Sequence, residues 1–178
     1  MRTAISFIVI IFFATFTATA QYKVVPNMPF STLNTDPGYI LINEITGGFG
    51  LGKTSTPYSK YFFGFTSISG YQVNKNFIFG AGTGLYFYES GLLVPLFLDF
   101  RFSFHINHVT PYIFGDGGLL LNISNFNGTK LFINPGVGAI YTLSKKVALN
   151  LGAGILSQAV GAVRDSFINL KLGVIYKF

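Results

Sequence analysis

The sequence predicts an all-β protein, an eight-stranded antiparallel up-and-down transmembrane β-barrel, and three observations support this prediction. Only 10% of the 178 residues are charged, whereas about a quarter are charged in a soluble domain. The last twelve residues alternate, with apolar or aromatic side chains at even positions from Ile168 to Phe178 and mostly polar or small ones between them. Seven earlier stretches alternate in a related way. A period of two separates the sets onto opposite faces of a strand, and about 9–11 residues cross a bilayer as a tilted strand.

Composition excludes several classes of function. The chain has no cysteine, which excludes a disulfide framework, a thiol catalyst and a thiolate metal site. Its net charge of +6 includes no basic cluster larger than Lys145-Lys146, so the basic stripe that nucleic-acid binding needs is missing. After the N-terminus no apolar run reaches about 18 residues, which disfavours membrane-spanning helices. The 21 glycines lie mostly inside apolar stretches, where they weaken a helix further.

Residues 1–20 are predicted to be a secretory signal peptide. Arg2 supplies the positive charge, residues 5–16 the apolar core, and Ala18-Thr19-Ala20 the small-residue cleavage site. An uncleaved membrane anchor is the alternative, but the apolar core is short for one. Residues 21–37 contain three prolines among polar residues and are expected to form an irregular lead-in.

The barrel is expected to occupy residues 38–178, where eight alternating stretches recur at the spacing of a small up-and-down barrel. The stretches are residues 39–52, 60–73, 76–89, 92–106, 110–123, 130–143, 147–157 and 166–178.

The connections test this topology. If both termini lie in the periplasm, the connections after even-numbered strands are periplasmic and should be short. They are residues 74–76, 107–109 and 144–146. The predicted outer loops are residues 53–59, 124–129 and, longest of all, 158–165. The remaining outer connection, near residues 89–91, is short and departs from the trend.

The two faces of the fourth stretch show which side of the barrel meets lipid. One face carries Leu96, Leu98, Phe100, Phe102 and Phe104, and the other carries Asp99, Arg101, Ser103 and His105. An apolar exterior with a polar or small interior is typical of a membrane barrel. A soluble lipocalin-like barrel would show the reverse pattern, and an exposed row of phenylalanines would make it aggregate. The second stretch, which begins Tyr61-Phe62-Phe63, alternates poorly and its faces are left unassigned.

Four segments resemble the outer-membrane β-barrel proteins of Bacteroidetes-type bacteria, a family similar to the small OmpA/OmpX-type barrels. They are Gly70-Tyr71-Gln72-Val73, Gly80-Ala81-Gly82-Thr83-Gly84, Val94-Pro95-Leu96-Phe97-Leu98-Asp99-Phe100-Arg101 and Pro111-Tyr112-Ile113-Phe114-Gly115-Asp116-Gly117-Gly118. The resemblance spans nearly the whole mature chain and implies a place in the cell outer membrane, surrounded by its lipid. It also implies insertion by the outer-membrane assembly machinery, with Tyr176 and Phe178 as the C-terminal assembly signal. It specifies architecture and says little about activity.

A small set of ionisable residues falls on the predicted inner face, because a charge facing lipid at mid-depth would cost about 2–4 kcal/mol. They are Glu44, Asp99, Arg101, Asp116 and Lys171, with His105 and Lys177 near strand ends. Closure of the barrel makes Glu44 and Lys171 neighbours. The adjacency of strands four and five brings Arg101 near Asp116, with Asp99 as a third member. Two ion-pair clusters are hypothesised, and a structural plug is favoured over an ion path or proton relay.

The favoured function is a non-enzymatic structural or surface-interaction role, for a monomer without cofactor that presents loops such as residues 158–165. The alternatives are a narrow solute channel and a lipid-A-modifying enzyme. Such an enzyme needs a Ser or His with a carboxylate near the outer leaflet, but His105 and His108 lie at the predicted periplasmic end. Their three-residue spacing also places them on opposite faces of a strand, and only a turn at Asn107 would bring them together, so no metal site is expected.

The glycine runs at residues 80–84 and 115–118 raise the question of a phosphate-binding loop. They lack the Lys-Ser/Thr pair and the following helix that such a loop requires. We expect them instead to let the barrel curve or to leave room for bulky inward side chains such as Tyr86.

Overall fold

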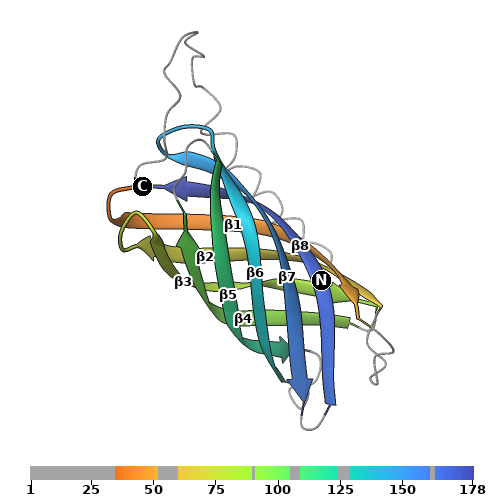
Figure 1. Ribbon diagram of the computed structural model, residues 1–178. Coiled ribbons are helices and arrows are strands. Elements are labelled where there is room, and N and C mark those ends of the chain that lie inside the picture. The colour runs from red at the N-terminus through yellow and green to blue at the C-terminus, as the bar shows by residue number, and fades with distance from the viewer. Residues whose placement is uncertain (1–34, 52–59, 90, 105–108, 124–128, 161–162) are drawn as a thin grey trace, which may run out of the picture.

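The chain forms a closed antiparallel barrel in which each strand pairs with its sequence neighbours and the last strand pairs with the first (Figure 1). This computed structural model describes residues 35–51, 60–89, 91–104, 109–123, 129–160 and 163–178. The strands are β1 (Gly38–Gly50), β2 (Tyr61–Gln72), β3 (Phe77–Tyr88), β4 (Gly91–Ser103), β5 (Val109–Asn122), β6 (Lys130–Thr142), β7 (Val147–Val160) and β8 (Val163–Lys177). The predicted eight-stranded up-and-down barrel is confirmed.

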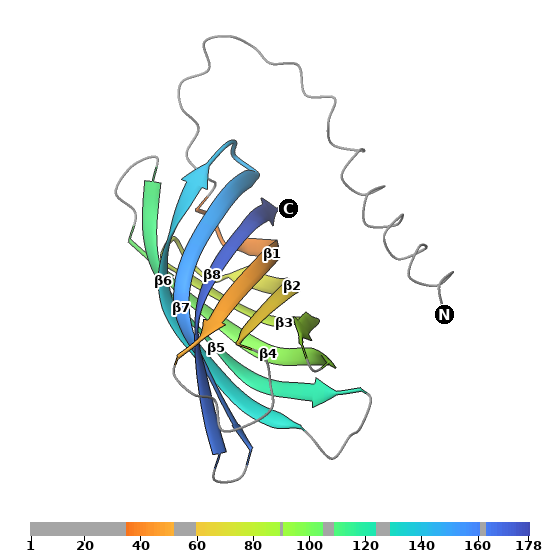
Figure 2. The ribbon, with the colours of Figure 1, turned by 90° about the vertical axis from the view of Figure 1, so that its right-hand side faces the viewer.

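The last hairpin corrects one predicted connection. Residues 158–165 are not an outer loop, because β7 continues to Val160, β8 begins at Val163, and Gln158 pairs with Asp165. The far ends of these strands project beyond their neighbours in both Figure 1 and Figure 2. The polar side chains that suggest a loop in the sequence point into the barrel instead, where Gln158 and Asp165 are buried.

Two of the predicted short turns lie in the described part of the chain and are held by side-chain caps. After β2, Oδ1 of Asn74 accepts hydrogen bonds from the backbone N–H groups of Asn76 and Phe77, both at 2.9 Å. After β6, Oγ of Ser144 accepts from the N–H groups of Lys146 and Val147. Asn and Ser favour such turns because their side chains bond to backbone groups two or three residues on.

Several predictions fall outside the described residues. These are the signal peptide at residues 1–20, the lead-in as far as residue 34, the outer loops at 53–59 and 124–128, and the two histidines, His105 and His108. Among the described residues, no helix is long and apolar enough to cross a membrane.

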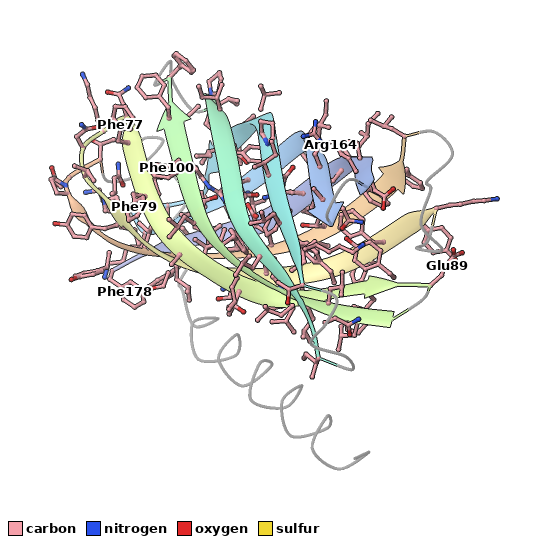
Figure 3. The ribbon with its side chains drawn as sticks, turned by 90° about the horizontal axis from the view of Figure 1, so that it is seen from below. Phe77, Phe79, Glu89, Phe100, Arg164 and Phe178 are labelled. Carbon is pink, nitrogen blue, oxygen red and sulfur yellow. The ribbon has the colours of Figure 1, made fainter. Side chains whose placement is uncertain are left out.

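The outside of the barrel is an apolar band. Phe77, Phe79 and Phe100 point away from the barrel, on the side where Phe178 also lies, whereas Glu89 lies at the opposite end (Figure 3). Neighbouring outer rings pack against one another, as in the pair Phe79–Phe100, whose centroids are 4.9 Å apart. The structure also assigns the faces of β2: its outward Phe63 is 54% exposed, and its inward neighbour is buried. A hydrocarbon environment suits this surface, and water does not.

The inside of the barrel is filled with side chains, and inward glycines provide the room. A Cβ placed on Gly64 would lie 2.2 Å from Cδ1 of Tyr86, and one on Gly82 would lie 2.4 Å from Cζ of Phe97. Tyr86 therefore packs against Gly64 of the neighbouring strand, whereas within the run at residues 80–84 the aromatic neighbour is Phe97. Gly115, by contrast, lies on the outer face of β5, between the inward Phe114 and Asp116, and a Cβ there would meet nothing within 4 Å.

Candidate functional site

The centre of the barrel holds the five charged residues that the sequence places on the inner face. We refer to them as the central charge network: Glu44 from β1, Asp99 and Arg101 from β4, Asp116 from β5 and Lys171 from β8. None of them is more than 4% exposed. Strand alternation turns them inward, because the opposite face of each strand meets the apolar exterior. Buried charges persist only when they are paired and hydrogen-bonded.

Ion pairs join these residues into one chain of contacts across the lumen. Arg101 bridges two acids, with Nε 3.0 Å from Oδ1 of Asp99 and Nη2 2.9 Å from Oε1 of Glu44. Lys171 bridges two as well, with Nζ 3.4 Å from Oε2 of Glu44 and 2.5 Å from Oδ2 of Asp116. Glu44 is therefore the link between the two cations.

This arrangement corrects the hypothesis of two separate clusters. Closure of the barrel does bring Glu44 and Lys171 within ion-pair distance. Arg101, however, pairs with Asp99 and reaches across the lumen to Glu44, while Asp116 pairs with Lys171. The reason is the width of the barrel: an eight-stranded barrel is just wide enough for its side chains, so residues of non-adjacent strands meet inside it.

Neutral polar side chains complete the network, and the sequence analysis did not include them in the site. Nδ2 of Asn150 donates to Oε1 of Glu44 at 2.6 Å, and Nδ2 of Asn134 donates to Oδ2 of Asp116 at 2.9 Å. Nδ2 of Asn169 in turn donates to Oδ1 of Asn134 at 3.1 Å. Their inward positions on β6, β7 and β8 are readable from strand alternation. Two of the three contacts are not readable in this way, because Asn150 meets Glu44 and Asn169 meets Asn134 across strands that are not adjacent.

Aromatic rings enclose the two cations. The guanidinium carbon of Arg101 lies 5.5 Å from the ring centroid of Tyr112, and Nζ of Lys171 lies 4.6 Å from that of Phe114. Such cation–π contacts are attractive, and more strongly so when the cation is desolvated. Farther along the lumen, towards the connection between β7 and β8, a group of rings packs together. Its members are Phe62, Tyr86, Tyr88 and Phe167.

A second buried polar group lies at this same end of the barrel, and the sequence analysis missed it. Lys130, Gln158 and Asp165 are all no more than 5% exposed. The hydroxyl of Tyr88 donates to Oε1 of Gln158 at 3.3 Å. Asp165 was missed because it was assigned to an outer loop rather than to the inner face of β8.

At the end of the barrel where β1 begins and β8 ends, inner side chains contact the residues just before β1. Nζ of Lys177 donates to Oε1 of Gln72 at 2.8 Å and also to the backbone carbonyl of Asp36. Nε2 of Gln72 reaches the carbonyl of Thr35 at 3.5 Å. The last described residues of the lead-in therefore contact the inner side chains at this end.

The two aromatic residues of the predicted assembly signal lie on the outer face at the same end. Their ring centroids are 5.0 Å apart, and Phe178 is 71% exposed. The backbone N–H of Phe178 donates to the carbonyl of Tyr39, which joins the end of the chain to the start of β1.

The chemistry available in the lumen is that of paired charges. Ser103, which the sequence places beside His105 on the inner face, is 2% exposed, while the histidine lies outside the described residues. Within the described strands and turns, no three or more His, Asp and Glu side chains are grouped so that they could hold a metal ion.

Comparison with known proteins identifies the fold. No protein-family model and no curated protein matches the sequence. The barrel is similar to the crystal structure of Neisserial surface protein A, with 18% identity and a TM-score of 0.62, over 80% of this chain and 99% of that one. It is also similar to a de novo designed transmembrane β-barrel, with 18% identity and a TM-score of 0.50, over 82% and 100%. The N-terminal barrel of Pseudomonas aeruginosa OprF is 15% identical, with a TM-score of 0.48, over 79% and 100%. The first two likenesses show the fold of a small transmembrane β-barrel.

Proposed function

We propose that this chain is a non-enzymatic outer-membrane β-barrel of the small OmpA/OmpX type, with a structural role and a lumen that does not conduct. The observation that supports this proposal best is the central charge network. Its ion pairs run from Asp99 through Arg101, Glu44 and Lys171 to Asp116, and the N···O distance in each pair is 3.4 Å or less. Side chains therefore span the lumen at mid-barrel, and no solute passes without displacing them.

The energy of these contacts opposes an open path. Removing one partner of a buried ion pair costs about 3–5 kcal/mol, because the other charge is left without compensation. The cations are 1% and 2% exposed, and each contacts two carboxylates. A continuous wet path would have to separate several of these pairs at once. The aromatic group around Tyr86 adds a second obstruction farther along the lumen.

The same architecture supports a proposal for the location and the partners of the protein. We propose export through the signal peptide at residues 1–20, with outer-membrane lipid around the apolar band and a monomeric barrel. The resemblance to Bacteroidetes-type barrels supports insertion by the outer-membrane assembly machinery through Tyr176 and Phe178. If the protein also has a surface partner, the projecting hairpin of β7 and β8 is the element best placed to meet it (Figure 2).

Planar-bilayer conductance of the refolded mature chain tests the proposal. Wild type should show no resolvable steady channel. Arg101→Ala removes a buried cation of the network, whereas Arg164→Ala removes an exposed arginine near the start of β8 and serves as the control. A steady wild-type conductance that Arg101→Ala changes in size or ion preference, and that Arg164→Ala leaves alone, would overturn the plugged barrel in favour of a narrow solute channel. An altered lipid-A profile in cells that lack the protein would instead favour an enzyme.

A further inference from the structure

Two acidic side chains of the central charge network face each other on neighbouring strands. Asp99 and Asp116 are direct partners in the register of β4 and β5, and both point inward. Directly opposed residues on one face of an antiparallel pair have Cβ atoms about 4.5–5.5 Å apart, and like charges at such positions are destabilising. The two carboxyl groups therefore lie side by side on the inner face of the barrel. Two ionised carboxylates would repel each other at this position.

The charges of the network do not balance if every group is ionised. Three carboxylates, those of Glu44, Asp99 and Asp116, face only two cations, Arg101 and Lys171. The network would then hold one net negative charge in the interior of the barrel. An uncompensated buried charge is costly, and a group in that position takes up or loses a proton instead.

Hydrogen bonding shows where a proton fits. Oδ2 of Asp116 accepts from Nζ of Lys171 at 2.5 Å and from Nδ2 of Asn134 at 2.9 Å. Oδ1 of Asp116 is buried and receives no hydrogen bond from the described residues. Both oxygens of Asp99 accept from Nε of Arg101, at 3.0 and 3.1 Å. A hydrogen atom on Oδ1 of Asp116 would let this oxygen donate a hydrogen bond to the carboxylate of its cross-strand neighbour Asp99.

We propose that the lumen contains a proton-binding site, in which Asp116 carries a proton on Oδ1 and donates it to the carboxylate of Asp99. The proton comes from solvent while the barrel closes, and its binding leaves the network neutral. Glu44 and Asp99 then balance the two cations. The site stands independently of whether the barrel conducts, because it rests on the charge count and the register of β4 and β5.

The surroundings set the direction of the pH dependence. The titratable and charged groups around Asp116 and its partners come from five strands: Glu44 of β1, Tyr86 of β3, Asp99 and Arg101 of β4, Tyr112 of β5 itself and Lys171 of β8. β6 contributes the neutral Asn134 and β7 the neutral Asn150. In the unfolded chain an aspartate releases its proton near pH ~3.9, so at neutral pH the folded barrel holds one proton more than the unfolded chain. Its stability therefore falls as the pH rises above the range in which the unfolded aspartate titrates, and it stops falling once the folded barrel has also released that proton.

Carbon-13 NMR of the aspartate carboxyl groups, in the mature chain refolded into micelles, tests the site directly. The sequence contains four aspartates. At neutral pH one carboxyl carbon should show the chemical shift of a protonated acid. That signal should vanish in Asp116→Asn and persist in Asp36→Asn, which changes an exposed aspartate. Four carboxylate shifts in wild type, or a protonated signal that survives Asp116→Asn, would overturn the proposal. If the carboxyl chemical shifts differ between sodium chloride and choline chloride, a bound metal cation occupies the site instead of the proton, and the proposal fails.

A pair of isosteric variants gives a second test through stability. In Asp116→Asn the new amide donates to Asp99 as the bound proton does, and its oxygen still accepts from Lys171. Its urea midpoint should be at least as high as that of wild type at neutral pH, and it should lack the decline with rising pH that the wild-type midpoint shows. Asp99→Asn removes a carboxylate partner of Arg101 and should lower the midpoint at neutral pH. If Asp116→Asn lowers the midpoint as much as Asp99→Asn does, Asp116 is ionised and the proposal fails.

Discussion

Replacing Arg101 with methionine should destabilise the barrel strongly, although methionine keeps most of the volume of the side chain. Arg101 is 1% exposed, and its guanidinium lies 2.9 Å from Oε1 of Glu44 and 3.0 Å from Oδ1 of Asp99. Glu44 keeps Lys171 and Asn150 as partners after the change, whereas Asp99 loses the donor to both of its oxygens. One stranded carboxylate places the cost near the lower end of the range for a broken buried pair, about 3 kcal/mol. That cost corresponds to roughly a hundredfold change in the folding equilibrium.

Urea unfolding of the protein in lipid vesicles measures this cost, with the heat-modified gel shift and far-UV circular dichroism as two readouts. Arg164→Met, at an exposed arginine, is the matched control and should change the free energy of unfolding by less than about 0.5 kcal/mol. If Arg101→Met does not fold, Arg101→Lys provides a milder test. It keeps the charge but loses the two-pronged geometry that reaches both acids, and should fall between wild type and Arg101→Met.

One result would refute the reasoning. If Arg101→Met unfolds at the same urea concentration as Arg164→Met, the ion pairs across the lumen contribute nothing to stability. The structural role of the network would then have to be abandoned, whatever the conductance measurement shows.

Two further predictions concern packing and assembly. Gly64→Ala places a methyl group against Tyr86 and should lower the free energy of unfolding in urea by about 1–3 kcal/mol. Gly115→Ala, where a Cβ meets nothing within 4 Å, should be close to neutral. Equal effects of the two substitutions would contradict the packing of Tyr86 against Gly64. Phe178→Ala should reduce the yield of assembly into the outer membrane of cells more than it reduces the yield of unassisted refolding into vesicles. Phe100→Ala should affect both yields equally. If Phe178→Ala also lowers both yields equally, Phe178 is not part of an assembly signal.

The architecture could be predicted from the sequence because it depends on local pattern. A period of two assigns each side chain to one of two faces, and an exterior of phenylalanine and leucine allows only one of those faces to meet lipid. This is why the inward positions of Glu44, Arg101 and Lys171 follow from the sequence alone. The alternation of apolar and polar residues does not predict the strand where the inner face is unusually polar. At Gln158 and Asp165 the strand residues have the composition of a loop.

The partners of the inner side chains could not be predicted in the same way. Sequence reasoning pairs residues on adjacent strands, and so it foresaw the contact between Glu44 and Lys171 across the closing seam. The reach of Arg101 from β4 to β1 depends on the diameter of the closed barrel and on the register of every strand between them. Only the tertiary structure determines these, because they are properties of the whole sheet. The sequence by itself therefore determined that the five charges of the central charge network are buried, and the closed fold decided which of them neutralise one another.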